Sequence, residues 1–155
     1  MTTERKPIND DIPCNATAMR KASRRLTQLY DEAIGGSGLR STQFAILSEL
    51  DLLAEAPPTM AELAAILVMD RSALGHNLRP LERDGLVELR QSDTDRRRRH
   101  VVMTARGKAR YREGLRLWAE AQERFNRVFG KDEATALRMT LLHIAYDERL
   151  GRLND

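Results

Sequence analysis

The sequence predicts a mainly α-helical fold that carries one small β-hairpin. Apolar residues recur at steps of three and four in several stretches of the chain, as they do along one face of a helix. Two short runs, Leu86–Arg90 and His100–Met103, alternate like strands and flank the charged loop Gln91–Arg99. The length of 155 residues, with 41% apolar and 32% charged side chains, suits one globular domain over residues 1–155.

Two helices are expected before the central part of the chain. The first spans about residues 15–34, and the glycine-rich sequence GGSG at residues 35–38 ends it. The second begins near Ser41, whose hydroxyl we expect to cap it. It stops at Pro57 and Pro58, because proline lacks the N–H that a helix interior requires.

The central part of the chain predicts two short helices in succession. Thr59 and Glu62 fit the capping box T-x-x-E, which starts the first of them. Asp70 can cap the second, which buries a leucine stripe and ends at Gly85. Followed by the hairpin, this pair predicts a winged helix-turn-helix over about residues 41–104. The outward face of the second helix carries Arg71, Ser72, Gly75, His76, Arg79 and Arg83.

Two further helices complete the expected fold. Thr104 can cap a long helix that ends near Gly130, and Asp132 can cap a last helix. The segment of about residues 105–152 therefore flanks the central module on one side, as residues 15–34 do on the other. Apolar faces on these flanking helices suit dimerisation, although they could equally form an intramolecular core.

Positive charge is concentrated in one third of the chain. The net charge is +3, yet residues 71–112 hold 12 Lys and Arg against 5 Asp and Glu, so this segment carries +7 and the rest −4. A basic segment on an otherwise acidic body is typical of a surface that binds phosphate groups. Scattered charges more often form a solvated face with ion pairs, but these charges are clustered.

The outward face of the helix after Asp70 has the residue types of a DNA-reading surface. A helix fits the major groove of duplex DNA, and side chains near its N-terminus can reach base edges. Gly75 would let the helix backbone lie close to the duplex. Pro80 removes an N–H inside this helix, so the helix either kinks there or ends near Arg79.

The hairpin loop SDTDRRRRH, residues 92–100, suits a second contact with DNA. Long cationic side chains on a protruding loop can enter the minor groove, whose negative potential favours arginine. We expect Asp95 to hold Arg96 or Arg97 in a fixed pose through charge-assisted hydrogen bonds, with Arg98 beside them. The competing interpretation is a solvated charged turn.

These motifs together resemble the MarR family of bacterial transcription regulators. The resemblance runs from about Cys14 to the end of the chain and rests on GLRSTQFAIL, TMAELAAIL, DRSALGHNLRPLERDGLVE and DTDRRRRHVVMTARG. Its most specific part is the hairpin pattern D-x-x-D-R-R followed by a strand and L/M-T-x-x-G. The chain departs from the family pattern at Ser92, where an aspartate is usual, and at Arg40, where a capping threonine is common.

The resemblance implies a homodimer, built from the first and last helices, that binds a palindromic operator in double-stranded DNA and represses transcription. It also implies that a small aromatic or phenolic effector binds between the dimer helices and the winged motif and releases repression. A carboxylic acid needs a cation and a ring needs aromatic walls. The residues that suit such a pocket are Arg24, Arg25, Tyr30, Phe44 and Trp118.

Cys14 offers an alternative, redox-based sensor. It lies at the start of the first helix, where the helix dipole lowers the pKa of a thiol, and some MarR-type repressors sense peroxide through a cysteine in this region. Asp10 and Asp11 would raise that pKa, and the chain holds no second cysteine to resolve a sulfenic acid. A single cysteine also excludes a disulfide within the chain.

Other function classes find no support in the sequence. It contains no glycine-rich phosphate loop and no nucleophile beside a base, so we expect neither an enzyme nor a cofactor. His76, His100 and His143 are too far apart in sequence to predict a metal site. No apolar run reaches the roughly 18 residues of a membrane span, and no secretion signal is recognised, so we expect a cytoplasmic protein. A winged-helix module that binds only protein is the remaining alternative.

Overall fold

The structure contains six α-helices and one hairpin within residues 13–92, 95 and 98–151, the residues that this computed structural model describes. The element order is the one that the sequence predicts. In chain order the elements are α1 (Asn15–Ile34), the short 3₁₀ helix η1 (Gly35–Ser37), α2 (Ser41–Leu52), α3 (Met60–Ile66), α4 (Arg71–Arg83), β1 (Val87–Gln91), β2 (Arg99–Met103), α5 (Ala105–Phe129), α6 (Lys131–Ala145) and the 3₁₀ helix η2 (Glu148–Leu150).

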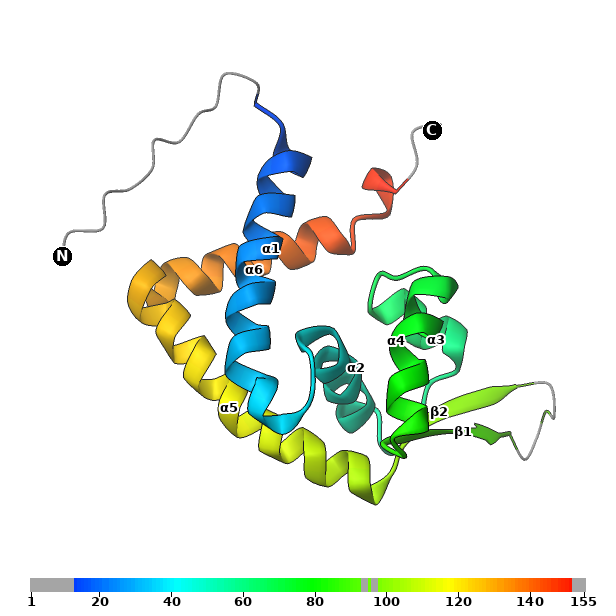
Figure 1. Cartoon of the computed structure of the whole chain (residues 1–155). Helices are drawn as coiled ribbons and strands as arrows, with labels where there is room; N and C mark the ends of the chain where they lie inside the picture. The colour runs from blue at the N-terminus through cyan, green and yellow to red at the C-terminus, as the bar shows by residue number, and fades with distance from the viewer. Residues whose placement is uncertain (1–12, 93–94, 96–97, 152–155) are drawn as a thin grey trace.

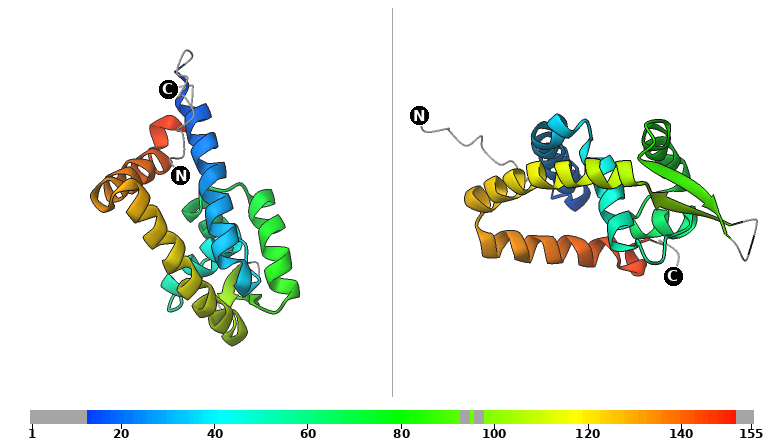
Figure 2. Two further views of the ribbon diagram at one scale, coloured as in Figure 1. Left: turned by 60° about the vertical axis from the view of Figure 1, so that its left-hand side comes forward. Right: turned by 90° about the horizontal axis from the view of Figure 1, so that it is seen from below.

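The long helix α5 runs along one edge of the molecule (Figure 1). Helices α1 and α2 pack against it, and α2 also contacts α4 and β2. Helices α3 and α4 lie together on one side of the molecule, and the hairpin projects away from the body there. Helix α6 turns back from the end of α5 and diverges from it, and its far end lies near α3, where the Tyr146 hydroxyl donates to the Ile66 carbonyl (Figure 1 and Figure 2).

The hydrophobic core joins the helix-turn-helix to α2 and α5. Leu47 of α2, Leu63 of α3, and Leu74 and Leu81 of α4 have 0–1% of their surface exposed. Burying each of these side chains contributes roughly 1.5–3 kcal/mol of hydrophobic free energy. The leucine stripe expected on the helix after Asp70 is therefore confirmed.

The hairpin is held at its base by the connection between α2 and α3. Strands β1 and β2 pair antiparallel, with Val87 opposite Met103. On the outer edge of β2, the Val101 N–H donates to the carbonyl of Pro58 at 2.8 Å, and Thr59 forms an isolated bridge with His100. The position of the hairpin is thus fixed from two sides.

Several expected helix ends are confirmed by their hydrogen bonds. Thr59 and Glu62 form the reciprocal capping box, and the Asp70 carboxylate accepts from the Ala73 N–H at 2.7 Å. The Thr104 hydroxyl accepts from the N–H of Gly107 at the start of α5. At the end of α4, Gly85 adopts a left-handed φ of 70°, which few residues other than glycine tolerate.

Two expected caps are wrong. Ser41 is the first residue inside α2, and its own N–H donates to the carboxylate of Asp31, a residue of α1, at 2.6 Å. The last helix starts at Lys131 after Gly130, so Asp132 lies in its first turn rather than at its cap. An acidic residue there still interacts favourably with the helix dipole.

Helix α4 continues through Pro80 to Arg83, so the proline does not end it. The missing N–H leaves the carbonyl four residues earlier without its helical donor, and that carbonyl belongs to His76 on the outward face. Water or a ligand can satisfy a carbonyl on that face.

Much of the apolar surface around α6 is uncovered in a single chain. The large hydrophobic residues exposed there are Val128, Phe129, Met139, Leu141, Leu142, Tyr146 and Leu150. Leu141 and Leu150, which are 38% and 67% exposed, do not point into the core of a single chain. Among the described residues, no helix is long and apolar enough to cross a bilayer.

Candidate nucleic-acid interface

Helix α4 presents two chemically distinct faces. Leu74, Leu78 and Leu81 are buried, whereas Arg71, Ser72, His76 and Arg79 are exposed on the opposite side. Gly75 lies between these exposed residues, and a Cβ built on it would have no other atom within 4 Å. Any contact that needs a bare backbone at Gly75 must therefore come from a molecule outside the chain.

The hairpin loop carries an ion pair between Asp95 and Arg98. The Arg98 guanidinium lies 3.7 Å from the Asp95 carboxylate, and both side chains are about half or more exposed. The Arg98 N–H also donates to the Asp95 carbonyl at 2.9 Å, which closes a tight turn. Arg96 and Arg97, the other two expected minor-groove residues, lie outside the described residues.

Arginines from the helix and from the hairpin meet at one hollow of about 490 Å³. We call it the basic hollow; its lining consists of Thr59, Met60, Ala61, Glu62, Arg71, Arg98 and Arg99. Arg71 begins α4 and Arg99 begins β2, so residues far apart in sequence border the same space. The two DNA-reading elements that the sequence predicts are therefore adjacent.

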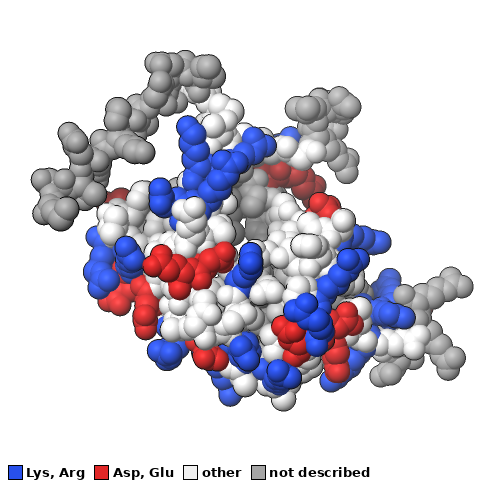
Figure 3. Space-filling model, viewed as in Figure 1, with Lys and Arg blue, Asp and Glu red and all other residues white. Residues whose placement is uncertain are grey.

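The surface charge follows the same elements. In the space-filling view, Lys and Arg side chains lie over α4 and the hairpin, and a second basic group lies over α1 (Figure 3). Acidic side chains lie next to the basic ones in the same view. In the sequence, Glu82 and Asp84 flank Arg83 at the end of α4. Arg83 pairs with Asp84 at 3.0 Å, so its charge is partly neutralised.

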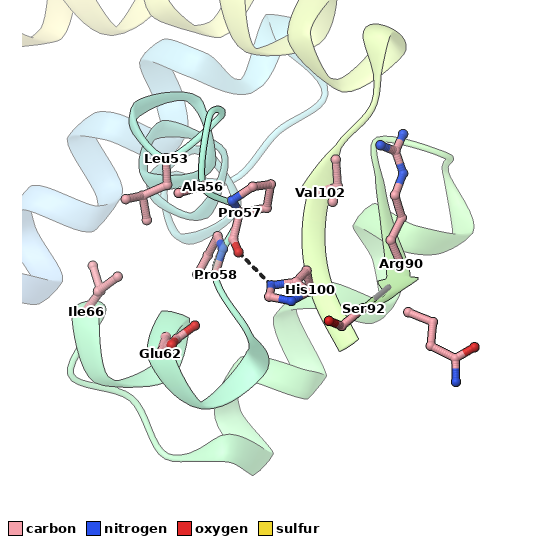
Figure 4. Close-up of a pocket in the computed structure, with 11 residues that line it drawn as sticks. Leu53, Ala56, Pro57, Pro58, Glu62, Ile66, Arg90, Ser92, His100 and Val102 are labelled. Carbon is pink, nitrogen blue, oxygen red and sulfur yellow. Dashed lines mark hydrogen bonds between the residues drawn. The ribbon is translucent and has the colours of Figure 1, made fainter. Parts of the chain in front are cut away.

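His100 lies at the junction between the hairpin and the α2–α3 connection. Its Nδ1 lies 2.7 Å from the carbonyl of Pro57, which requires the proton on Nδ1 (Figure 4). It also borders a shallow pocket of about 690 Å³ with Glu62, Ile66 and Arg90. His100 is thus a tether for the hairpin, a role that its alternating sequence context did not indicate.

The five residues expected to form an effector pocket are not brought together. Phe44 and Trp118 stack with ring centroids 6.2 Å apart in the core between α2 and α5. Tyr30 faces another side and borders a cavity of about 310 Å³ between α1, α5 and α6. Arg24 and Arg25 are exposed on α1. The expected pocket is therefore divided between the core, this cavity and the surface.

Tyr30 is held in place by α5. Its hydroxyl donates to the Gln122 side-chain oxygen at 2.6 Å, and burial raises the pKa of the phenol. The rest of the cavity is lined mainly by aliphatic and aromatic side chains, with Arg138 as its cation. This cavity, rather than the region of Phe44, has the apolar walls and few polar groups of a small-molecule site.

Cys14 is exposed at the N-cap position of α1. The Thr17 hydroxyl donates to its sulfur at 3.3 Å, and this bond, with the backbone N–H groups of the first turn, lowers the pKa of the thiol. The direction of the shift agrees with the expectation from the helix position. Asp10 and Asp11, which were expected to oppose it, lie outside the described residues.

Two residues of this region, Arg99 and His100, are not among the site residues that the sequence predicts, and Gly107 enters there only as the glycine of the T-x-x-G motif. Arg99 belongs to the four-arginine run, so its charge was visible but its place at the strand start was not. Gly107 is a buried glycine at which an added Cβ would lie 2.0 Å from the Leu86 carbonyl oxygen. Among the described residues no group of His, Cys, Asp and Glu could hold a metal ion.

Comparison with known proteins relates this chain to transcriptional regulators of the MarR family. A family model described as the MarR family matches residues 37–98. A search of curated proteins finds no match. The structure of the Mycobacterium tuberculosis transcriptional regulator MosR in complex with DNA is similar, with 32% identity, 90% of this chain and 99% of that chain covered, and a TM-score of 0.79.

Two further structures are similar to this chain. A probable transcriptional regulator from Pseudomonas aeruginosa is 26% identical over 87% of this chain and 98% of its own, with a TM-score of 0.76. CouR from Rhodococcus jostii RHA1, bound to p-coumaroyl-CoA, is 22% identical over 88% and 93%, with a TM-score of 0.73, and shows the shared fold alone. The winged helix-turn-helix, the family match and the likeness to MosR over nearly its full length agree. The chain belongs to the MarR family of transcriptional regulators, a non-enzymatic family of DNA-binding proteins.

Proposed function

We propose that the protein is a homodimeric repressor that binds a palindromic operator in double-stranded DNA. The observation that carries the proposal is the exposed face of α4, where Arg71, Ser72, His76 and Arg79 surround an unobstructed Gly75. The helix would lie in the major groove while Arg96, Arg97 and Arg98 of the hairpin enter the minor groove beside it. MosR, a relative of this chain, was crystallised with DNA, which supports the same use of the fold.

A dimer would supply the second half of a palindromic site. Exposed apolar side chains at the end of α5 and along α6, among them Phe129 at 48% and Leu142 at 42% exposure, support pairing with a second copy. Large exposed apolar patches are uncommon in monomers and often mark sites of association. Two helices α4 related by a twofold axis would then read half-sites about one helical turn apart.

The base-reading role of α4 can be tested without knowing the operator. Purified protein is used to select binders from a random duplex library, and the selected duplex is bound by wild type and by Arg79→Ala. We expect selection of a palindrome, and a loss of discrimination in Arg79→Ala at one position per half-site, worth about 1–3 kcal/mol. Selection of no common sequence, or DNA binding that Arg79→Ala leaves unchanged, would contradict the proposal. A protein-only module would bind neither duplex.

A small aromatic acid is the proposed releasing effector, with the Tyr30 cavity as its site. The apolar walls and Arg138 would accommodate a ring and a carboxylate. Benzoate and p-coumarate are suitable probes, and they should dissociate the protein from the selected duplex. Arg138→Gln should abolish that release and leave DNA affinity unchanged, whereas equal release from both proteins would rule out this cavity.

Thiol oxidation at Cys14 is the second candidate for the releasing signal, supported by its exposure and lowered pKa. The thiolate sulfur would attack one oxygen of hydrogen peroxide and the O–O bond would break. Sulfenic acid and hydroxide would form, and the hydroxide would take a proton from the solvent to become water. Peroxide should then release DNA from wild type and not from Cys14→Ser. Thr17→Ala should slow the reaction, because it removes a hydrogen bond that stabilises the thiolate. Release from Cys14→Ser would exclude this route.

A further inference from the structure

The basic hollow separates the two elements that would read DNA. Arg71 borders it from the first residue of α4, and Arg98 and Arg99 border it from the hairpin. Its volume of about 490 Å³ lies open on the surface, between the helix and the wing. If α4 and the hairpin both bind DNA, the hollow between them must accommodate the part of the duplex that lies between their two contacts.

The charge of the hollow favours an anion. Its lining holds three arginines and one acidic residue, Glu62. The Glu62 carboxylate already accepts from the N–H and the hydroxyl of Thr59, at 2.7 and 2.9 Å, and these bonds lower its pKa. Within the described residues, the guanidinium groups of Arg71 and Arg99 form no hydrogen bond or ion pair, whereas that of Arg98 has the long contact with Asp95. Two guanidinium groups are therefore available to a ligand.

The shape of DNA identifies that ligand. The major and minor grooves of one face of a duplex are separated by a single sugar-phosphate backbone. A protein with a helix in the major groove and a wing in the adjacent minor groove must straddle this backbone. Guanidinium groups bind phosphate oxygens in bidentate geometry and are the residue type most suited to that contact.

We infer that the basic hollow seats the phosphates of the backbone that separates the two grooves, with Arg71 and Arg99 as the phosphate ligands. The inference rests on the proposed function, because it assumes that α4 and the hairpin enter adjacent grooves. It moves Arg71 from the base-reading group to the phosphate-binding group, and it adds Arg99. Phosphate contacts fix the orientation of the protein on the duplex but carry no sequence information.

The test compares specific with non-specific binding. Full-length wild type, Arg71→Gln, Arg99→Gln and the double variant are titrated against the selected duplex and against a random duplex, by fluorescence anisotropy at several salt concentrations. Arg116→Gln is the matched control, since Arg116 is an exposed arginine in the middle of α5 that pairs with Glu120. Arg99→Lys keeps the charge and loses the bidentate geometry.

Each single variant should weaken binding to both duplexes by about tenfold per subunit, and so by about a hundredfold for the dimer, as expected for the loss of a hydrogen bond to a charged group in each half. The preference for the selected duplex should stay unchanged. The slope of log affinity against log salt should become shallower by about 1.8 per substitution, because the homodimer loses one phosphate contact in each subunit. Arg99→Lys should keep the salt slope and lose part of the affinity, while Arg116→Gln should behave as wild type.

Weakened binding of the selected duplex alone would overturn the inference, because it would identify base readers. Affinity and salt slope that both variants leave unchanged would overturn it as well. Inorganic phosphate that displaces DNA at an ionic strength at which chloride does not would assign the hollow to a free anion instead. If wild type binds neither duplex, the proposed function fails first, and the inference fails with it.

Discussion

Gly107 shows how one residue fixes the distance between two parts of the molecule. The Thr104 hydroxyl and N–H both contact the turn after α4: the hydroxyl donates to the carbonyl of Gly85 at 2.7 Å, and the N–H donates to that of Leu86 at 3.0 Å. Gly107 then lies so close to the Leu86 carbonyl that no side chain fits. The T-x-x-G pattern thus has a physical cause, since threonine caps α5 and glycine lets it approach.

Gly107→Ala should destabilise the protein by about 1–3 kcal/mol or more, because the added methyl overlaps backbone that cannot move aside. Denaturant unfolding followed by circular dichroism measures the change. Gly35→Ala is the matched control, because a Cβ there meets nothing within 4 Å. Equal stability of the two variants would contradict the close approach.

Val68 is a strained residue in the turn of the helix-turn-helix. Its φ of 52° is the only positive φ of a non-glycine residue in the described chain, and a β-branched side chain tolerates it poorly. The side chain is 59% exposed, so little burial would be lost on its removal. Val68→Gly should therefore raise the free energy of unfolding by about 0.5–1 kcal/mol. A decrease in thermal midpoint would show that the Val68 side chain has a packing role.

At the scale of elements, the sequence predicts those features that depend on near neighbours. The caps at Thr59 and Asp70 and the end at Gly85 were predicted because each depends on residues within a few positions. The cap of α2 was not, since Asp31 reaches Ser41 only after α1 and α2 pack together. The candidate site also combines features that depend on near neighbours with features that depend on the tertiary fold. The exposed arginines of α4 could be predicted from periodicity, but their meeting with Arg99 requires the tertiary fold.

The capping box of α3 should make stability depend on pH. Hydrogen bonds from Thr59 lower the pKa of Glu62 in the folded state, so its contribution is fully present above the ordinary glutamate pKa of about 4.3. That contribution is lost as the pH falls from there through the lowered folded value. Glu62→Gln should remove this part of the acid dependence, because a glutamine amide can still accept from Thr59 but does not titrate. Identical acid unfolding of variant and wild type would contradict the assignment.

At the scale of the whole molecule, the apolar face of α6 packs against little else in the chain. Just after the end of α6, the Tyr146 hydroxyl donates a hydrogen bond to the Ile66 carbonyl of the helix-turn-helix at 2.8 Å. Among the described residues this is the one hydrogen bond that joins the two parts. The apolar face of α6 is otherwise open. The sequence predicts this apolar face. It does not show whether the face packs within the chain or against a second copy, because the same periodicity fits an intramolecular core and a dimer interface.

A charged residue on that face should prevent dimerisation. Leu142→Glu would place a carboxylate in the proposed interface, so we expect a mass close to one chain by light scattering, against two for wild type. Leu52→Glu is the control, since Leu52 is 77% exposed on a different helix. The monomeric variant should also lose most of its affinity for the palindrome and keep its weak affinity for a single half-site. A wild-type mass of one chain would rule out the dimer.

The contact between β2 and the α2–α3 connection also limits what else the hairpin can pair with. A strand edge with free N–H and C=O groups invites another chain to add to the sheet and so to aggregate. Here the edge of β2 is occupied by the segment that starts with Pro57 and Pro58, and prolines have no N–H with which to extend a ladder. Pairing on that side ends after one short bridge. The chain can therefore expose a hairpin to solvent without offering this edge to its neighbours.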